Sequence, residues 1–428
     1  MRISPLKSGP LLALVVLLVV APAAAFGSEV HFESDTILQV FQRDIATDQD
    51  KTVLPGYEYL QLDAGALDDY GLAFHFYGWG RADLADSHYF DDSTDGTLLY
   101  GYLEYRRPVN RFSVRLGRQY IFEGVANEAV DGLRVSSDLG DYFSLSLYGG
   151  LPVALDTESG RSGDSIYGGR LSHHFGTQYE VGLSYKAITN DSDTAEKMIG
   201  VDMSAFLPAN MSFYGYSAYN SDTNGWAEHN YELRIPIASV TLKPYFQHFA
   251  YQDFFGAGAN VIGPFRMLAN TDESLTAYGL DALWSVNDAW TLAAKSKFYD
   301  YKQKDSVETA SVALTWHGDD ETQYGGEIGR TFADQTAGND YTMLRLYGYC
   351  EAMAGRTPLD FVSADVLWAL YDESIYGEDR SLFLSLGTGK HFLDKALTVK
   401  ISGDYSQDPY FDNDLRGQLT LAYAYDHK

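Results

Sequence analysis

Hydrophobic and polar residues alternate with a period of two in the segment between Arg111 and Pro152. Three short stretches share this pattern, at residues 112–116, 133–135 and 143–147. Successive side chains of a β-strand point to opposite faces, so each stretch is predicted to be a strand with one apolar face and one polar face. Such strands suit a soluble sandwich, with the apolar face inward, or a transmembrane barrel, with that face toward lipid and the polar face toward a hydrated lumen.

The same alternation recurs along the rest of the chain, and the connections between strands alternate between short and long. Tight turns are expected near residues 67–69 and 108–110, long polar loops near residues 43–56 and 82–96, and a further long loop near residues 119–129. This rhythm is typical of an up-and-down barrel with periplasmic turns and extracellular loops. We therefore predict an all-β, antiparallel transmembrane β-barrel of about 22 strands, with 18–22 as the range, in one domain over residues 26–428.

The first 25 residues are predicted to be a cleaved signal peptide and not part of the fold. Arg2 and Lys7 supply a basic start, residues 11–21 are an unbroken apolar run, and residues 23–25 (Ala-Ala-Ala) fit a cleavage site. No later apolar run approaches the length of a transmembrane helix. An exported chain that crosses a membrane with strands is expected in the cell outer membrane. A soluble, secreted all-β protein is the weaker alternative, because one core would have to serve some 400 residues.

The composition agrees with a barrel and limits the partners. The chain has 33 Tyr, 23 Phe and 40 Gly, against 12 Pro and one Cys. Abundant tyrosine suits aromatic girdles at two membrane interfaces. A single cysteine forms no intramolecular disulfide and encodes no C-x-x-C-H haem site. The formal net charge of −28 argues against nucleic acid as a partner. It permits cations, a basic protein, and contact with outer-membrane lipid and lipopolysaccharide through divalent ions.

The segment around these first strands resembles Gram-negative outer-membrane porins. Porin-like families commonly show a strand that ends in Gly-Arg, a loop, and a following strand that begins Asp-Gly-hydrophobic-Arg. Here these are residues 114–119 (VRLGRQ) and 131–134 (DGLR), with a hairpin into residues 143–147 (FSLSL). The resemblance covers about 40 residues. It implies an outer-membrane channel for passive passage of ions or small polar solutes.

The resemblance has one departure, and the expected bore leaves a second assignment open. Porin-like barrels usually end on Phe, whereas here three polar residues follow Tyr425, which separates the chain from trimeric general porins and not from the barrel. A barrel of about 22 strands also has a wide bore, and too few residues precede the first strand to form a plug domain. Porin–cytochrome conduits use such a barrel as a sleeve around a multihaem c-type cytochrome. The alternative function is therefore a structural sleeve in an outer-membrane electron conduit.

Alternation assigns several charged residues to the lumen. Arg106, Arg115, Arg134 and Arg170 are predicted to line the pore, together with Glu104. Because the first three lie on consecutive predicted strands, they are candidates for a basic patch at a constriction. The alternative is that they are ordinary lumen charges paired with neighbours such as Glu104. Other residues assigned to the lumen face are Lys186, Arg234, Lys295, Lys297, Lys400, Glu180, Glu232 and Glu327.

Two loops are candidates for folding into the lumen. Residues 121–130 are too apolar for a freely exposed loop, and residues 254–270 contain several large apolar side chains among glycines. The alternative is that each packs on the barrel rim or on a neighbouring subunit. Either loop would narrow the bore if it folded inward.

No catalytic or metal constellation is predicted. No nucleophile–His–acid pattern stands out, and His75, His88 and His248 lie near strands without a recognisable partner. His173 and His174 are adjacent, so their side chains point to opposite faces and make a poor metal site. The chain is therefore predicted not to be an enzyme and to carry no cofactor.

Overall fold

The structure is a computed structural model that describes residues 29–45, 48–85, 89–153, 163–190, 193–256, 268, 271–318, 322–333, 340–351 and 357–427. The predicted signal peptide lies outside the described residues. The strands are β1 (Glu29–Ile45), β2 (Asp48–Val53), β3 (Pro55–Gly65), β4 (Gly71–Asp83), β5 (Thr94–Arg106), β6 (Ser113–Glu123), β7 (Ala126–Leu139), β8 (Phe143–Pro152), β9 (Asp164–Phe175), β10 (Tyr179–Asn190), β11 (Asp193–Leu207), β12 (Met211–Asn220), β13 (Gly225–Ile237), β14 (Val240–Ala250), β15 (Ser274–Asn287), β16 (Trp290–Tyr301), β17 (Val307–His317), β18 (Gln323–Ala333), β19 (Tyr341–Cys350), β20 (Phe361–Ile375), β21 (Glu378–Phe392), β22 (Leu397–Asp408) and β23 (Phe411–His427). Two 3-10 turns, η1 (Val109–Arg111) and η2 (Pro208–Asn210), and one short helix, α2 (Tyr251–Phe255), complete the described elements.

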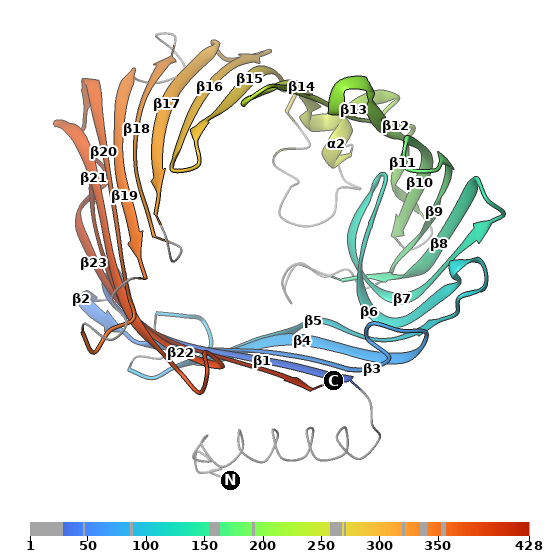
Figure 1. The fold of residues 1–428 in the computed structure, drawn as a ribbon, viewed down its shortest axis with the longest axis horizontal. Helices are drawn as coiled ribbons and strands as arrows, with labels where there is room; N and C mark the ends of the chain where they lie inside the picture. Colours follow the sequence, from blue (N-terminus) through green and yellow to red (C-terminus); the bar gives the residue numbers. More distant parts are fainter. Residues whose placement is uncertain are drawn as a thin grey trace.

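The strands close into one antiparallel barrel. Each strand from β3 onward pairs with the next, β23 pairs with β1, and β1 pairs with β3 (Figure 1). β2 also pairs with β1, and only Leu54 separates it from β3, so β2 is the continuation of β3. The 23 strands of the sheet therefore occupy 22 positions around the ring. The predicted all-β barrel of about 22 strands is confirmed.

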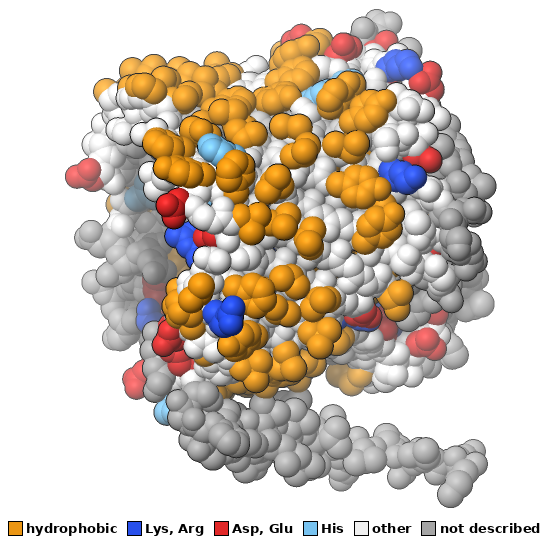
Figure 2. Space-filling view, turned by 90° about the vertical axis from the view of Figure 1, so that its right-hand side faces the viewer, with side chains coloured by type: hydrophobic (Ala, Val, Ile, Leu, Met, Phe, Trp, Pro, Cys, Tyr) orange, Lys and Arg blue, Asp and Glu red, His pale blue; other side chains and the backbone are white. Residues whose placement is uncertain are grey.

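Strand alternation defines an inner and an outer face around the whole ring. On β10 and β11, Lys186 and Asp202 belong to the inner series, while Leu183 and Val201 belong to the outer series. Large apolar side chains are exposed on the outer series, among them Leu72, Leu103, Leu116, Leu147, Leu171, Leu183, Val201, Leu280, Val312, Ile328, Leu346, Leu386 and Ile401. Figure 2 shows one side of this outer surface, where apolar side chains predominate and charged ones are sparse. A closed barrel with an apolar exterior is an outer-membrane β-barrel. Among the described residues, no helix is both long and apolar enough to cross a membrane.

Two of the expected long loops are largely strand. Residues 43–56 were predicted to be a polar loop, but β1 and β2 extend the first hairpin through most of that segment. Residues 119–129 were also predicted to be a loop, but β6 and β7 pair up to Glu123 and Ala126, leaving Gly124 and Val125 as the turn. Both hairpins continue because backbone pairing does not need an apolar face, and polar side chains are tolerated where strands rise beyond the membrane or enter the lumen.

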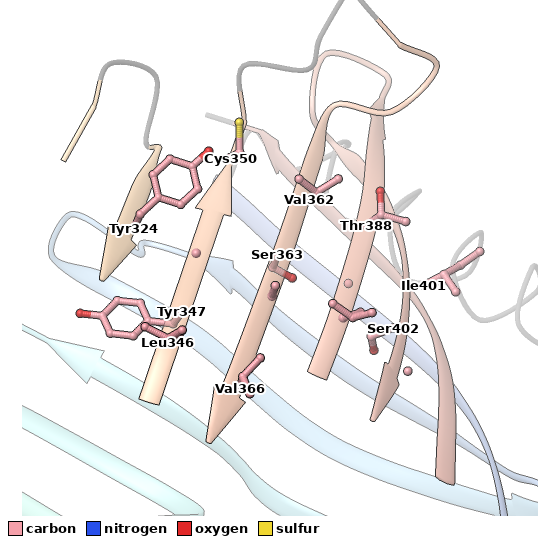
Figure 3. Close-up of a pocket in the computed structure, with 15 residues that line it drawn as sticks. Tyr324, Leu346, Tyr347, Cys350, Val362, Ser363, Val366, Thr388, Ile401 and Ser402 are labelled. Carbon is pink, nitrogen blue, oxygen red and sulfur yellow. The ribbon is translucent and has the colours of Figure 1, made fainter. Parts of the chain in front are cut away.

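A hollow of about 770 Å³ lies where β18 to β22 run side by side (Figure 3). Its lining includes outer-face residues such as Leu346, Leu386 and Ile401 around the small residues Gly348 and Gly403. The alternation of these strands therefore places most of the lining on the membrane side of the wall. The hollow does not belong to the pore.

Candidate functional site

The lumen contains a hairpin built from the distal halves of β6 and β7. We call residues Arg118–Asp131 the inner hairpin. Figure 1 shows its tip inside the ring of strands, near β10 and β11, where α2 also lies. Its two strands stay in register to the tip, with Arg118 opposite Asp131 and Glu123 opposite Ala126. The expectation that this apolar segment folds inward is confirmed.

The base of the inner hairpin lies where close backbone approach requires glycine. Gly117 has a φ of 129°, and a Cβ there would lie 2.3 Å from the carbonyl oxygen of Gly101. Gly132, directly opposite Gly117, would place a Cβ 2.2 Å from the carbonyl oxygen of Gly149. Beside the glycines, Arg118 Nε donates to Asp131 Oδ1 at 2.7 Å. The Gly-Arg and Asp-Gly pairs of the porin-like motif are therefore cross-strand partners at the base of the hairpin.

The tip rests directly on the inner face of β10 and β11. Gly124 has a φ of 55°, and a Cβ there would lie 2.1 Å from Ser184 Oγ. The backbone N–H of Val125 donates to the same Ser184 oxygen at 3.1 Å. A Cβ on Gly200 would lie 2.4 Å from Val125 Cγ1. Small residues on the wall thus create the space that the tip fills.

Two apolar clusters hold the inner hairpin against the wall. One combines Ile121, Ala126 and Val130 of the hairpin with side chains of β8 to β11, namely Tyr148, Ile166, Ile188 and Ala195. The other surrounds Val125 with Met198, Ala218 and Ala227, and Phe254 of α2 packs against it. Burial of this kind stabilises the packed arrangement of hairpin and wall by about 1.5–3 kcal/mol for each large apolar side chain. Residues 257–267, 269 and 270 of the second loop that was expected to fold inward lie outside the described residues.

A buried lysine joins the inner hairpin to the wall. Lys186 of β10 places its Nζ 3.2 Å from Glu128 Oε1 on the hairpin and 2.7 Å from Glu196 Oε1 on β11. Its side chain is only 7% exposed. A charged group so far from water requires paired partners, and here two carboxylates from different elements supply them. The bridge therefore ties the hairpin to the wall in one arrangement.

The opposite face of the inner hairpin carries exposed aromatic rings. Gln119 and Ile121 face the wall and are buried, so alternation turns Tyr120 and Phe122 away from it. Phe122 is 78% exposed and Tyr120 is 54% exposed. The Tyr120 hydroxyl contacts the side-chain oxygen of Asn127 on the other hairpin strand. The hairpin thus presents an amphipathic surface away from the β8–β13 wall.

The predicted pore-lining arginines all lie on the inner series, and each has an acidic partner. Arg115 and Arg134 are directly opposite each other on β6 and β7. Arg115 Nε lies 2.8 Å from Glu104 Oε1, and Arg134 Nε lies 2.6 Å from Glu123 Oε1. The structure therefore brings Arg115 and Arg134 together, but each is paired with a glutamate, so the positive groups alternate with negative ones.

Arg106 and Arg170, the other predicted arginines, are held in different ways. Arg106 donates to the carbonyl oxygens of Ala66 and Leu67 in the β3–β4 turn, at 2.5 Å each. Arg170 bridges two acids, with Nη1 2.7 Å from Glu180 Oε1 and Nε 3.0 Å from Asp202 Oδ2. Both arginines fix the wall, since each cross-links neighbouring backbone or strands.

His75 forms a cluster with carboxylates that sequence reasoning did not find. Its Nδ1 lies 2.6 Å from Asp63 Oδ1 and its Nε2 lies 3.6 Å from Glu104 Oε2. The ring stacks on Tyr102 at a centroid distance of 4.8 Å, and Arg115 lies over the same tyrosine ring. Only the cross-strand register reveals this cluster, because its members are far apart in sequence.

Lumen-facing charges on the other side of the barrel pair along their own wall. Arg345 Nε donates to Asp365 Oδ1 at 3.0 Å, and its guanidinium lies 5.1 Å from the centre of the Tyr347 ring. Lys297 Nζ lies 5.5 Å from the centre of the Tyr245 ring. Within the described ranges, the inner hairpin packs against β8–β13. None of these contacts of Arg345 and Lys297 involves the hairpin. The two sides of the lumen therefore differ in construction.

The chain is similar along most of its length to several solved structures, at low sequence identity. Matches include the outer membrane protein opdK of Pseudomonas aeruginosa (9% identity, 94% of this chain and 99% of that chain, TM-score 0.44) and OccAB4 of Acinetobacter baumannii (10%, 94% and 98%, TM-score 0.48). A BenF-like porin from Pseudomonas fluorescens Pf-5 matches at 12% identity over 94% and 99% of the chains, with a TM-score of 0.47. No protein-family model and no curated protein matches the sequence. The barrel assignment rests on the strand pairing of this chain itself.

Proposed function

We propose that this protein is an outer-membrane channel for passive passage of ions and small polar solutes. The observation that supports this most directly is the inner hairpin, which lies inside a closed barrel and narrows its bore from one side. A hydrated lumen with charged walls and a constricting segment is the arrangement from which channels derive selectivity. The remaining passage runs past the exposed face of Tyr120 and Phe122.

The charges beside the inner hairpin suit small polar solutes. Arg115 and Arg134 each stand next to a carboxylate, so the wall alternates between hydrogen-bond donors and acceptors. A passing ion or polar solute can exchange water for these groups without meeting a large field of one sign. On this proposal the arginines set a local transverse field, and the predicted basic patch acts together with Glu104 and Glu123.

The alternative of a sleeve around a multihaem cytochrome requires a guest in the bore. The inner hairpin and α2 already occupy the side of the lumen next to β9–β13. A guest would have to share the bore with them or displace them. Displacement would break the buried Lys186 bridge and two apolar clusters, which favours the channel over the sleeve.

Single-channel recording in planar bilayers tests the proposal. The purified barrel is expected to give stable, ohmic steps with a measurable ion preference from the reversal potential in a salt gradient. A folded barrel that gives no steps would refute the channel. Large, noisy steps in the intact protein would mean an unconstricted bore and would favour the sleeve. Folding is checked by heat-dependent electrophoretic mobility.

A further inference from the structure

The outer face of the barrel carries two histidines directly opposite each other on adjacent strands. His229 of β13 and His248 of β14 are register partners, and their ring centroids are 6.0 Å apart. Glu228, the neighbour of His229, lies opposite Phe249, which packs against Phe254 of α2 inside the barrel. Alternation therefore places both histidines on the outer side.

A hydroxyl group holds each imidazole ring from its flank. His229 Nδ1 lies 2.8 Å from Ser217 Oγ on β12, and His248 Nδ1 lies 3.0 Å from Thr276 Oγ1 on β15. Ser217 is the register partner of His229, and Thr276 is the register partner of His248. The four residues thus form one continuous row across four strands, with the imidazoles in the middle and a hydroxyl at each end.

This arrangement fixes which ring nitrogens remain for a ligand. Both Nδ1 atoms are engaged, so Nε2 is the atom each ring can offer. Histidines that bind metals characteristically use one nitrogen for the metal and donate the other N–H to a polar partner, which fixes the tautomer and orients the ring. The oxygens of Ser217 and Thr276 can accept such bonds from Nδ1–H.

The location also suits an ion. His248 lies two residues before Ala250, the end of β14, on the side of the barrel opposite the start of β1 and the end of β23. The site is therefore near the outer membrane interface, where water or a lipid phosphate is available. Trp226, which is 52% exposed, packs against His229 at a centroid distance of 4.9 Å and is typical of that interface.

We propose that His229 and His248 form a two-imidazole site for a divalent transition-metal ion on the outer surface of the barrel. Within the described residues no group of three or more His, Cys, Asp or Glu side chains is placed to hold a metal. The remaining ligands must therefore be water or phosphate oxygens. Imidazole nitrogen favours copper, nickel and zinc over magnesium and calcium, and copper binds most tightly in this series.

Copper titration of the full-length barrel in detergent micelles tests the site. We expect one tightly bound Cu²⁺ per barrel by calorimetry, with nitrogen couplings from two imidazoles in the electron paramagnetic resonance spectrum. His229→Gln and His248→Gln should each abolish this site. Thr276→Val, which removes the hydroxyl that orients His248, should weaken it by about tenfold while leaving both ligands in place.

His173→Gln is the matched control. His173 is also on the outer face, and its ring stacks on Tyr179, but its register partners are Phe143 and Val181 rather than a histidine. This variant should bind copper as the unchanged protein does. Copper binding that survives in the His229→Gln/His248→Gln double variant, or that is lost equally in His173→Gln, would overturn the proposal. So would the absence of any stoichiometric binding. Channel conductance is independent of all these outcomes.

Discussion

The two sides of the lumen share the same strand alternation but carry different inner surfaces. On β8–β13 the inner wall carries small residues such as Gly200 and Ala218, and the inner hairpin packs over them through Val125. On β15–β22 the wall carries Arg345 and Lys297 on the exposed lumen surface, each beside a tyrosine. The first side behaves as a small protein core inside the barrel, whereas on the second side charged side chains line the lumen. The comparison shows that a barrel can place a packed segment inside its lumen without adding a domain.

Removing the inner hairpin should produce the largest effect. Residues 120–129 can be replaced by Asn-Gly, because Gln119 and Val130 are register partners and a two-residue turn can join them. We expect the single-channel conductance to rise severalfold, because the hairpin no longer fills the side of the lumen beside β8–β13. An unchanged conductance in a folded barrel would mean that the hairpin does not limit flow.

Breaking the buried bridge should release the hairpin without removing it. In Lys186→Met, Glu128 and Glu196 lose the ammonium group that lies between them, and breaking a buried ion pair by removing one partner costs about 3–5 kcal/mol. We expect flickering steps as the hairpin leaves the wall, measured as excess open-channel noise. Lys297→Met, on the opposite wall beside Tyr245, is the control and should show no excess open-channel noise. Equal noise in both variants would argue against the bridge as the anchor.

A second set of changes tests whether the bridge acts through charge. Adding Glu128→Gln and Glu196→Gln to Lys186→Met removes the two carboxylates that have lost the lysine. Because the loss of all three charges is less costly than the loss of one partner, the triple variant should recover a quieter channel than Lys186→Met alone. Noise that stays at the level of the single variant would mean that the packing of the lysine chain, and not its charge, holds the hairpin.

Adding a methyl group at the tip of the hairpin should have a smaller effect, seen in the free energy of unfolding when alanine variants of two glycines are compared. Gly124 and Gly140 both have positive φ, at 55° and 74°, so alanine strains the backbone at either by about 1–2 kcal/mol. A Cβ on Gly140 meets nothing within 4 Å, whereas one on Gly124 meets Ser184. Gly124→Ala should therefore lose about 1–3 kcal/mol more free energy of unfolding than Gly140→Ala, measured by urea titration. Ser184→Gly should recover most of that difference; equal losses would contradict docking.

The architecture was predictable because its signal is local. Alternation of two residues and the rhythm of turns predicted about 22 strands, and they placed Arg106, Arg115, Arg134, Arg170 and Glu104 on the inner series. The excess of apolar residues in 121–130 also indicated an inward segment.

The partners of those residues were not predictable in the same way. Glu123 binds Arg134, and Lys186 joins Glu128 to Glu196, across separations that only the register defines. The loop prediction for residues 119–129 was wrong because the segment lies between two short alternating stretches, whereas backbone pairing continues to Glu123 and Ala126. The histidine row was also not predicted, because only the strand register brings its members together. His248 has no partner nearby in sequence, and His229 meets it only once β13 and β14 pair.

The smallest expected effect compares two arginines that are alike in their contacts but differ in their surroundings. Arg115 pairs with Glu104 and lies 5.3 Å from the Tyr102 ring centre, and Arg345 pairs with Asp365 beside Tyr347. Changing either to Gln removes one positive charge and leaves its carboxylate in the lumen. If flow is confined near the inner hairpin, the ion passes closer to Arg115, and the field there is less screened than in the wide part of the bore. Arg115→Gln should therefore shift the reversal potential toward cation preference more than Arg345→Gln does, in a salt gradient at low ionic strength. Equal shifts would mean that ions sample both walls alike, and the constriction would then not determine selectivity.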